Sequence, residues 1–352
     1  MAELTPMMQQ YLKTKEEYPD CILFYRLGDF YEMFFEDALT VTKELEITLT
    51  GKSCGLEERA PMCGVPYHAA EGYLNKLVSR GYKVAICEQT EQPQKGKSLV
   101  NRDVIRVVTP GTIMENSMLA EDRNNYIASV YIYDNQASVC FCDISTGSMQ
   151  ATVIDSSNFE NNLKSEIYKY MPKEIIINTQ ILSLKWLTDY LKNIIHCSVE
   201  LIDESEYNDF VVDETVKKQF DGKSFDTQMS RCLWQLLNYL SDTQKVGVEK
   251  LSTVDSYQQD EQNSFIKLSY TTTSNLELFE TIRSKEKRGS LLWVLDNTKT
   301  SFGKRMLRKV LSAPLMDKNE IDMRLDAVEY FNNNPMIRMD AQTHLKNIQD
   351  NY

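Results

Sequence analysis

The sequence predicts a multidomain α/β protein: a mixed α/β unit, then a second α/β unit, then an incomplete all-α unit. Its 352 residues are more than one ordinary domain needs. Up to about residue 245, short β-branched runs alternate with helical patterns. Beyond about residue 264, apolar residues recur only at helical spacing.

The first predicted unit spans residues 1–112 and mixes helices with strands. Its opening helix begins at Thr5-Pro6, because threonine is a good N-cap and proline suits the first helical position. Thr109-Pro110-Gly111 closes the unit, and residues 113–124 form a linker. The expected elements are helices over 5–17, 31–44 and 69–79 and strands over 21–27, 47–50, 82–87 and 103–108.

The second predicted unit spans residues 125–245 and begins with three strands. Asp134-Asn135 and Thr146-Gly147 supply turns between these strands, which predicts an antiparallel meander. Alternating helices and strands after such a meander predict a ribonuclease-H-like sheet. The expected elements are strands over 126–133, 137–144, 148–154, 174–177 and 198–202, with helices over 159–170, 182–194 and as far as 240.

The third predicted unit spans residues 258–352 and is helical throughout. Leu276, Phe279 and Ile282 recur at three-residue spacing, and residues 306–311 continue the helical pattern. The pattern stops at Tyr352 without a closing helix. We therefore expect the start of a helical domain rather than a complete one.

Composition places the chain among globular proteins, with 42% hydrophobic residues available for ordinary cores. The N-terminus lacks a basic segment followed by an apolar one, and no run approaches 18 apolar residues. A cytoplasmic protein without a membrane partner is expected. The eight cysteines form no C-x-x-C pair, which favours buried thiols over a disulfide scaffold or a zinc site.

The net charge of −12 argues against nucleic acid as a partner, but the charge is unevenly distributed. Residues 1–115 carry 13 Lys and Arg against 17 Asp and Glu, residues 116–264 carry 12 against 23, and residues 265–352 carry 14 against 11. A DNA contact is therefore expected at the two ends of the chain. The acidic middle is typical of a scaffold or a protein-facing module.

The run Gly28-Asp29-Phe30-Tyr31-Glu32 lies where a strand-like stretch gives way to a helix-like one. Local rules leave two interpretations open. An aromatic ring and a carboxylate two positions apart could serve as a wedge and a hydrogen-bonding partner for a distorted base pair. Phe30 could equally be a core aromatic, with Glu32 a first-turn helix charge that complements the dipole.

A longer motif surrounds this run, Phe24 to Ala38, with the sequence F-Y-R-L-G-D-F-Y-E-M-F-F-E-D-A. Further motifs follow in order at 61–68, 84–89, 107–112, 143–147, 275–278 and 289–296. Together they resemble the MutS family of bacterial DNA mismatch-repair proteins over nearly the whole chain. One departure is residues 269–274, where the family usually carries an aspartate, a threonine and an arginine pair.

The resemblance implies specific roles for the first motif. Phe30 would enter the minor groove and stack on the mispaired base, and Glu32 would hydrogen-bond to that base. The resemblance also implies that the three units are a mismatch-recognition domain, a connector domain and the start of a helical core. Further candidate DNA contacts lie in the segment 52–68, interpreted as a loop in or beside a groove. They are Lys52, Arg59, Pro61, Met62 and Tyr67.

The resemblance also implies partners and cofactors. Mismatched double-stranded DNA is expected as the ligand, at the nucleoid, with a homodimer in the full-length family and a downstream repair protein docking on the connector. Full-length members are ATPases that use ATP and Mg²⁺. This chain is expected to hold no metal and no catalytic residue. It is also expected to hold no nucleotide site, because none of its three Gly-Lys-Ser tripeptides has a glycine five positions earlier. Those positions hold Glu46, Glu91 and Lys217.

Two rival functions come from other classes. A ribonuclease-H-like fold can be a two-metal nuclease, for which Asp143 is a candidate ligand, with Asp203 or Glu204 joining it. In the MutS family, however, the connector is non-catalytic. The second rival is a stand-alone protein-interaction scaffold, suggested by the acidic middle segment.

Overall fold

The computed structural model describes residues 4–91, 100–114, 118–119, 123–245, 251–256, 265–266, 268–346 and 348. Contacts between residues divide the chain into two units. Unit 1 comprises residues 1–118 and 236–250, and unit 2 comprises residues 119–235 and 251–352. The boundaries of the three predicted domains stay a prediction.

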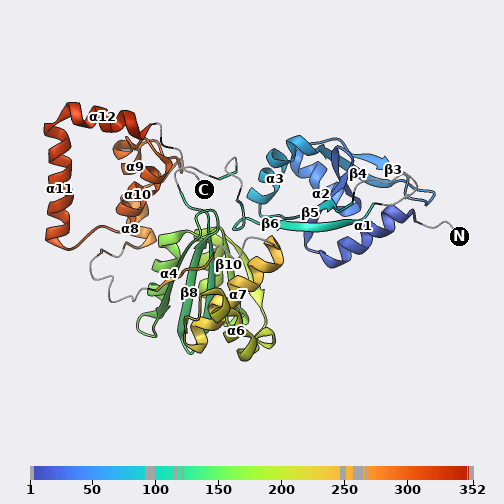
Figure 1. The fold of residues 1–352 in the computed structure, drawn as a ribbon, viewed down its shortest axis with the longest axis horizontal. Helices are drawn as coiled ribbons and strands as arrows, with labels where there is room; N and C mark the ends of the chain where they lie inside the picture. Colours follow the sequence, from blue (N-terminus) through green and yellow to red (C-terminus); the bar gives the residue numbers. More distant parts are fainter. Residues whose placement is uncertain are drawn as a thin grey trace. The chain divides into compact units, whose positions relative to one another are not determined.

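Unit 1 is built on a six-stranded sheet in the order β3-β4-β2-β1-β5-β6 (Figure 1). β1 and β5 are parallel, whereas all other neighbours are antiparallel. The elements are α1 (Pro6–Glu17), β1 (Cys21–Leu27), β2 (Phe30–Phe34), α2 (Phe35–Leu45), β3 (Thr50–Lys52), β4 (Ala60–Pro66), α3 (Ala70–Ser79), β5 (Lys83–Gln89) and β6 (Arg102–Val108). The mixed α/β prediction for this unit is confirmed.

Two faces of this sheet carry different helices. α1 packs on one face, where Tyr11 meets the rings of Tyr25 and Phe34 at centroid distances of 5.3 and 4.9 Å. α2 lies on the other face, where the thiol of Cys63 contacts the carbonyl of Ala38. The helix α1 begins with proline at its first turn as predicted, but the side chain of Thr5 makes no capping hydrogen bond.

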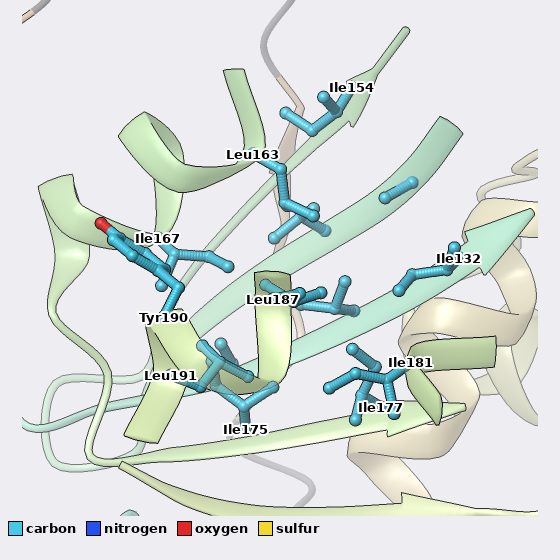
Figure 2. Packing of buried hydrophobic residues seen from close by; sticks show 14 of the residues in the cluster. Ile132, Ile154, Leu163, Ile167, Ile175, Ile177, Ile181, Leu187, Tyr190 and Leu191 are labelled. Carbon is cyan, nitrogen blue, oxygen red and sulfur yellow. The ribbon is translucent and has the colours of Figure 1, made fainter. Parts of the chain in front are cut away.

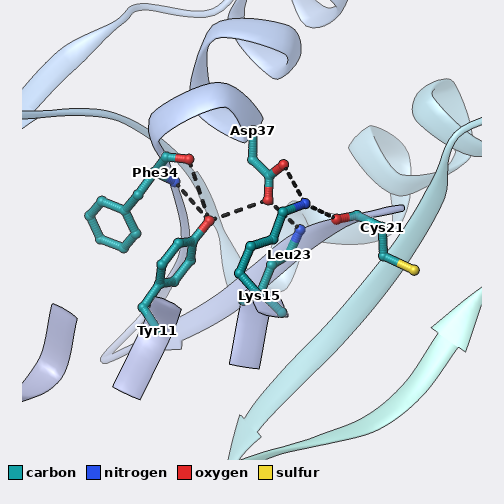
Figure 3. Close-up of polar contacts among 6 residues, drawn as sticks. All are labelled: Tyr11, Lys15, Cys21, Leu23, Phe34 and Asp37. Atoms are coloured by element: carbon teal, nitrogen blue, oxygen red, sulfur yellow. Dashed lines mark hydrogen bonds and ion pairs between the residues drawn. The ribbon is translucent and has the colours of Figure 1, made fainter. Parts of the chain in front are cut away.

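A buried carboxylate joins α1, β1 and α2 (Figure 3). Asp37 accepts hydrogen bonds from the Tyr11 hydroxyl at 3.2 Å and from the Leu23 backbone N–H at 3.0 Å. Its other oxygen lies 2.9 Å from the ammonium nitrogen of Lys15. The Tyr11 hydroxyl also accepts from the Phe34 N–H at 3.3 Å, so this network fixes the last residue of β2.

Unit 2 is built on a second six-stranded sheet, in the order β11-β10-β7-β8-β9-β12. β7, β8 and β9 form an antiparallel meander, β10 is parallel to β7, and β11 is parallel to β10. This is the topology that the ribonuclease-H-like prediction requires. The strands are β7 (Tyr126–Tyr133), β8 (Gln136–Asp143), β9 (Ser148–Ile154), β10 (Glu174–Asn178), β11 (Ser198–Ile202) and β12 (Asp255–Ser256).

The core of unit 2 lies between this sheet and the helices α4 (Phe159–Tyr170) and α5 (Lys185–Tyr190). Figure 2 shows Leu163 and Ile167 of α4 and Leu187 of α5 pointing toward strand residues such as Ile132. Buried apolar area of this kind is the main stabilising contribution to a fold. The remaining helices of this region are α6 (Asp209–Gln219) and α7 (Thr227–Gln244).

Helix α7 contacts the sheet of unit 2 through polar side chains. The Ser129 hydroxyl of β7 donates to the Cys232 carbonyl at 2.5 Å, and the Gln235 amide donates to the Ser129 oxygen at 2.7 Å. Both side chains are fully buried. Because a buried polar group is costly unless it is hydrogen-bonded, these contacts fix the position of α7 on β7.

Beyond residue 268 the described chain is helical, as predicted. The helices are α8 (Tyr270–Asn275), α9 (Leu291–Leu295), α10 (Ser301–Ser312), α11 (Lys318–Asn333) and α12 (Pro335–Leu345). A single bridge joins Phe265 to Leu315. The departure from the family pattern at 269–274 falls at the start of α8, where the Ser269 side chain accepts from the Thr272 N–H at 3.2 Å and caps the helix.

Several predicted elements are wrong. The helix predicted over 31–44 begins only at Phe35, because residues 30–34 are strand β2. The strand predicted over 47–50 lies at 50–52, where β4 supplies its pairing partner. The predicted helix over 182–194 is instead a 3₁₀ turn at Thr179–Ser183, the short α5 and a π turn at Leu191–Ile195.

All eight cysteines are free thiols, and seven of them are buried, in agreement with the predicted buried thiols. In the described part of the chain, no helix is both long and apolar enough to cross a membrane.

Candidate nucleic-acid interface

The candidate site is the hairpin that joins β1 to β2. Leu27 pairs with Phe30, which leaves Gly28-Asp29 as a two-residue turn. Gly28 has a φ of 61°, and of the two turn residues it alone has a positive φ. Glycine at the first central position is the requirement of a type II′ hairpin, whose twist matches the strands it joins.

Side chains alternate across β2 and thereby separate two groups. Phe30 is 46% exposed, Tyr31 is 6% exposed, and Glu32 is half-buried. Because successive strand residues point to opposite faces, Phe30 and Glu32 share one face and Tyr31 points to the other. Phe30 is therefore neither a core residue nor part of a helix, and Glu32 is not a first-turn helix charge.

Glu32 has a cationic neighbour on the same face. The ammonium nitrogen of Lys52, on β3, lies 2.5 Å from a Glu32 carboxylate oxygen. The strand between them contributes Gly64, directly opposite Glu32. Gly64 has no side chain, and a Cβ there would lie in van der Waals contact with both residues, 3.6 Å from Glu32 and 3.8 Å from the Phe30 ring.

The other candidate DNA contacts from the segment 52–68 do not all lie on the same face of the sheet. Met62 pairs with Phe34, so it lies on the Phe30 face, whereas its neighbour Pro61 points to the opposite one. Arg59 is exposed in the connection between β3 and β4. The interpretation of 52–68 as a loop is wrong for residues 60–66, which form β4 between β2 and β3.

Tyr67 contacts Arg26, a residue that the sequence analysis did not identify as part of the site. Its ring is 52% exposed and carries the Arg26 guanidinium, whose carbon lies 3.7 Å from the ring centroid. Arg26 pairs with Tyr31 across the hairpin, so this stack is on the face opposite Phe30. The signal that could have found it is the two-residue turn, which sets Arg26 opposite Tyr31.

Glu88, at the end of β5, completes this group. It accepts a hydrogen bond from the Tyr31 hydroxyl and lies 3.7 Å from an Arg26 nitrogen. Burial, and next the hydrogen bond to Glu88, raise the pKa of the Tyr31 phenol above its ordinary value. Tyr31 is therefore a neutral donor at physiological pH, and Glu88 is its acceptor.

The second unit does not assemble the nuclease site considered as a rival. Asp143 pairs with Ser148 and Tyr126 at one end of the sheet, whereas Asp203 and Glu204 follow β11 at the other end. About six strand residues separate the two ends, or roughly 20 Å. Each carboxylate also has hydrogen-bonding partners: Ser145 and Asn124 for Asp143, Ser205 for Asp203, and Asn178 for Glu204.

The absence of a metal cluster supports this correction. Among the described residues, no group of three or more His, Cys, Asp or Glu side chains is placed to hold a metal ion. A two-metal mechanism needs several carboxylates around one point. The candidate ligands of the rival nuclease, Asp143 with Asp203 or Glu204, are therefore not brought together.

Comparison with known protein families gives three matches in chain order. Residues 5–117 match MutS domain I, residues 125–254 match MutS domain II, and residues 271–351 match MutS domain III. The chain belongs to the MutS family. The hairpin that carries Phe30 and Glu32 thus lies within the MutS domain I match, and the ribonuclease-H-like sheet lies mostly within the MutS domain II match.

Curated relatives agree with this assignment. The chain is 48% identical to the DNA mismatch repair protein MutS of Ruminiclostridium cellulolyticum over 355 aligned positions, 47% identical to that of Lachnoclostridium phytofermentans, and 46% identical to that of Acetivibrio thermocellus. Each alignment includes 99% of this chain. The chain spans about 40% of the length of these MutS relatives.

Proposed function

We propose that unit 1 recognises mismatched double-stranded DNA in DNA mismatch repair, with Phe30 as an aromatic wedge and Glu32 as the partner of the mispaired base. The observation that carries this proposal is the placement of both side chains on one face of β2, next to a hairpin turn at which Phe30 is exposed. The names of the MutS relatives support the choice of ligand.

The wedge has a simple physical basis. Phe30 is a large apolar side chain that is 46% exposed at the tip of a hairpin, where it is not needed for the core. An apolar ring inserted between base steps must unstack them, which costs a few kcal/mol. A mispaired step is already weakly stacked and easily kinked, so insertion there costs less than at a matched step.

Glu32 needs a way to approach a polyanion. Lys52, at 2.5 Å, supplies a cation on the same face and offsets the repulsion between the carboxylate and phosphates. When Glu32 accepts a hydrogen bond from a base, Lys52 becomes available to a phosphate oxygen. In this proposal Lys52 contributes affinity, and Glu32 contributes discrimination.

The remaining predicted contacts extend the same interface. Met62 lies on the Phe30 face, and Arg59 is exposed beyond Lys52 on the β3–β4 connection, where it can meet a phosphate. Tyr67 and Pro61 lie on the other face, so their predicted contact with DNA needs the duplex to reach around the hairpin.

Further partners are proposed from the family. We propose that the full-length protein acts as a homodimer and hydrolyses ATP with Mg²⁺, and that a downstream repair protein docks on the ribonuclease-H-like unit. This chain is proposed to carry recognition without ATP hydrolysis, since none of its Gly-Lys-Ser tripeptides has the phosphate-loop spacing. One of the three, at 96–98, lies outside the described residues.

The test is Phe30→Ala, measured on the whole protein by competition between mismatched and matched duplexes. We expect the preference for the mismatch to be lost, while salt-dependent binding to matched duplex persists. Ile105→Ala is the control, because Ile105 is 48% exposed on β6, three strands away from β2. An unchanged preference in Phe30→Ala would falsify the wedge assignment.

The same binding measurement distinguishes mismatch recognition from the alternative function as a protein-interaction scaffold. A stand-alone interaction protein would bind neither duplex preferentially, and Phe30→Ala would leave all binding unchanged. A nuclease would cleave the duplex in Mg²⁺ and lose that activity in Asp143→Asn, whereas recognition by a wedge leaves the duplex intact.

A further inference from the structure

The turn that presents Phe30 is held from the opposite face of the sheet. The Arg26 side chain donates through Nε to the Gly28 carbonyl at 2.5 Å. The backbone N–H of Tyr67 donates to the Asp29 carbonyl at 2.9 Å. Both carbonyls of the two-residue turn therefore have a donor from outside the turn.

The side chains of the two residues that donate these hydrogen bonds, Arg26 and Tyr67, also contact each other. The Arg26 guanidinium lies over the Tyr67 ring, at 3.7 Å from its centroid, and over the Tyr31 ring, at 5.5 Å. Cation–π contact at such distances is attractive and is stronger where water is excluded. The Arg26 side chain is only 16% exposed, so water is largely excluded here.

A third strand anchors this arrangement. Glu88 lies 3.7 Å from an Arg26 nitrogen and accepts a hydrogen bond from the Tyr31 hydroxyl. Glu88 stands on β5, next to the residue that pairs with Tyr25 of β1. The turn is thereby connected to β5, the strand beside β1 in the sheet. We refer to Arg26, Tyr31, Tyr67 and Glu88 as the Arg26 cluster.

We propose that Arg26 is a positioning residue for mismatch recognition: its guanidinium, stacked on Tyr67 and bonded to Gly28, holds the Gly28-Asp29 turn so that Phe30 is presented for insertion. This inference rests on the function proposed for Phe30. Arg26 acts from the face opposite the wedge and does not itself touch the mispaired base.

The chemistry requires arginine rather than any cation. A planar guanidinium can lie flat on an aromatic ring while its Nε–H points along the plane to a carbonyl. A lysine ammonium carries the same charge but has neither the flat surface nor the fixed donor direction. Arg26→Lys therefore removes the positioning and keeps the charge.

The effect on binding is expected to be selective. Without the Arg26 cluster the turn populates several conformations, and only the fraction that presents Phe30 correctly can insert it. Phosphate contacts on the other face need no insertion and are unaffected. Positioning by Arg26 therefore raises the ratio of the affinity for mismatched duplex to the affinity for matched duplex. It does not raise the affinity for matched duplex.

The experiment compares Arg26→Lys with Arg80→Lys in the whole protein. Arg80 is an exposed arginine of the same unit that caps the end of α3 and pairs with Glu44 of α2, so it belongs to neither strand of the hairpin. We expect Arg26→Lys to lower the ratio of mismatched to matched affinity about 5-fold or more, without changing the salt dependence. We expect Arg80→Lys to leave the ratio unchanged.

A second measurement needs no DNA. Hydrogen exchange at the amides of residues 28–31 should be faster in Arg26→Lys than in the parent, while exchange in α1 stays the same. Tyr67→Ala removes the stacking surface from an exposed position and should give the same loss of ratio and faster exchange. The double variant should lose little more than either single variant, because both remove one arrangement.

Three outcomes would overturn the proposal. One is an unchanged ratio in both Arg26→Lys and Tyr67→Ala. Another is additive losses in the double variant. The third is a decrease of both affinities together with a shallower salt dependence in Arg26→Met, since Arg26 would then be a phosphate ligand. A Phe30→Ala variant with full mismatch preference would instead reject the proposed wedge itself.

Discussion

The ammonium nitrogen of Lys52 lies 2.5 Å from a carboxylate oxygen of Glu32, although the two residues belong to strands separated by β4. From the sequence, we predict that Lys52 contacts DNA phosphates and that Glu32 hydrogen-bonds to a base. The structure instead pairs them with each other in the free protein. In the proposed interface, DNA binding would therefore exchange these partners, so we expect the two residues not to act independently.

We expect Lys52→Met to weaken binding to matched and mismatched duplexes alike, because Glu32 then faces phosphates without a neighbouring cation. Adding Glu32→Gln should restore part of this loss. The coupling measured by the double-mutant cycle should be about 0.5 kcal/mol or more, as for residues in direct contact. Lys43→Met, at an exposed position of α2, is the control. Additive effects would show that the ion pair is irrelevant to DNA binding.

We expect Asp37→Asn to destabilise unit 1 by about 1–3 kcal/mol, since the carboxylate is buried and accepts from Tyr11, Leu23 and Lys15. The measurement is pulsed thiol labelling along a urea gradient, read at the buried cysteines of unit 1. Asp155→Asn, an exposed carboxylate that caps Ser157 in unit 2, should change stability by less than about 0.5 kcal/mol. Equal effects in both variants would contradict the role given to Asp37.

The buried thiols of unit 1 should make it less stable in alkali. Burial raises the pKa of Cys21 to about 11 and the pKa of Cys63 and of Cys87 to about 12. Since the folded state holds these protons more tightly, the stabilisation is complete below pH 9 and is lost as pH rises from 9 towards 12. The loss should be on the order of 1 kcal/mol per pH unit and thiol.

The urea midpoint of unit 1 at pH 8 and pH 10 measures this loss. Cys63→Ala should reduce the difference between the two midpoints. A difference that is the same in the parent and in Cys63→Ala would assign the alkaline effect to other groups.

We expect Asn178→Leu to destabilise unit 2 by about 2–4 kcal/mol. The Asn178 amide accepts from the Ile132 N–H and donates to the Ile132 carbonyl, both at 2.9 Å, and a leucine leaves these buried groups unpaired. Asn135→Gly is the control, because Asn135 has a φ of 56° in an exposed turn where glycine is unstrained. The readout is the unfolding midpoint followed by tryptophan fluorescence, since all three tryptophans lie in unit 2 and Trp234 is buried in α7.

The meander of unit 2 could be predicted because its signals are local. Asp134 and Asn135 both have positive φ, which is the requirement of a type I′ hairpin, and the flanking strands are apolar and β-branched. Strand β2 lacked such a signal. Tyr31, Phe34 and Ala38 are buried at helical spacing, so the run into α2 has the pattern of one helix.

Strand β4 was not predicted because its composition is that of a loop. Pro61, Gly64 and Pro66 are residues that strands usually exclude, and only the pairing with β2 and β3 makes this segment a strand. The Lys52–Glu32 pair depends on that register and therefore could not be predicted either. The resemblance to the family predicted the roles of Phe30 and Glu32, but it did not indicate a role for Arg26.

Strand β2 has only five residues, and alternate residues point to opposite faces of the sheet. Its length is thereby fixed, since Leu27 sets one end through the turn and Tyr11 sets the other through Phe34. Inserting or deleting one residue in this interval would exchange the two sets of side chains, moving Phe30 to the face of the Arg26 cluster and Tyr31 to the face of α1. We therefore expect substitutions within this strand to be tolerated more readily than a change in its residue count.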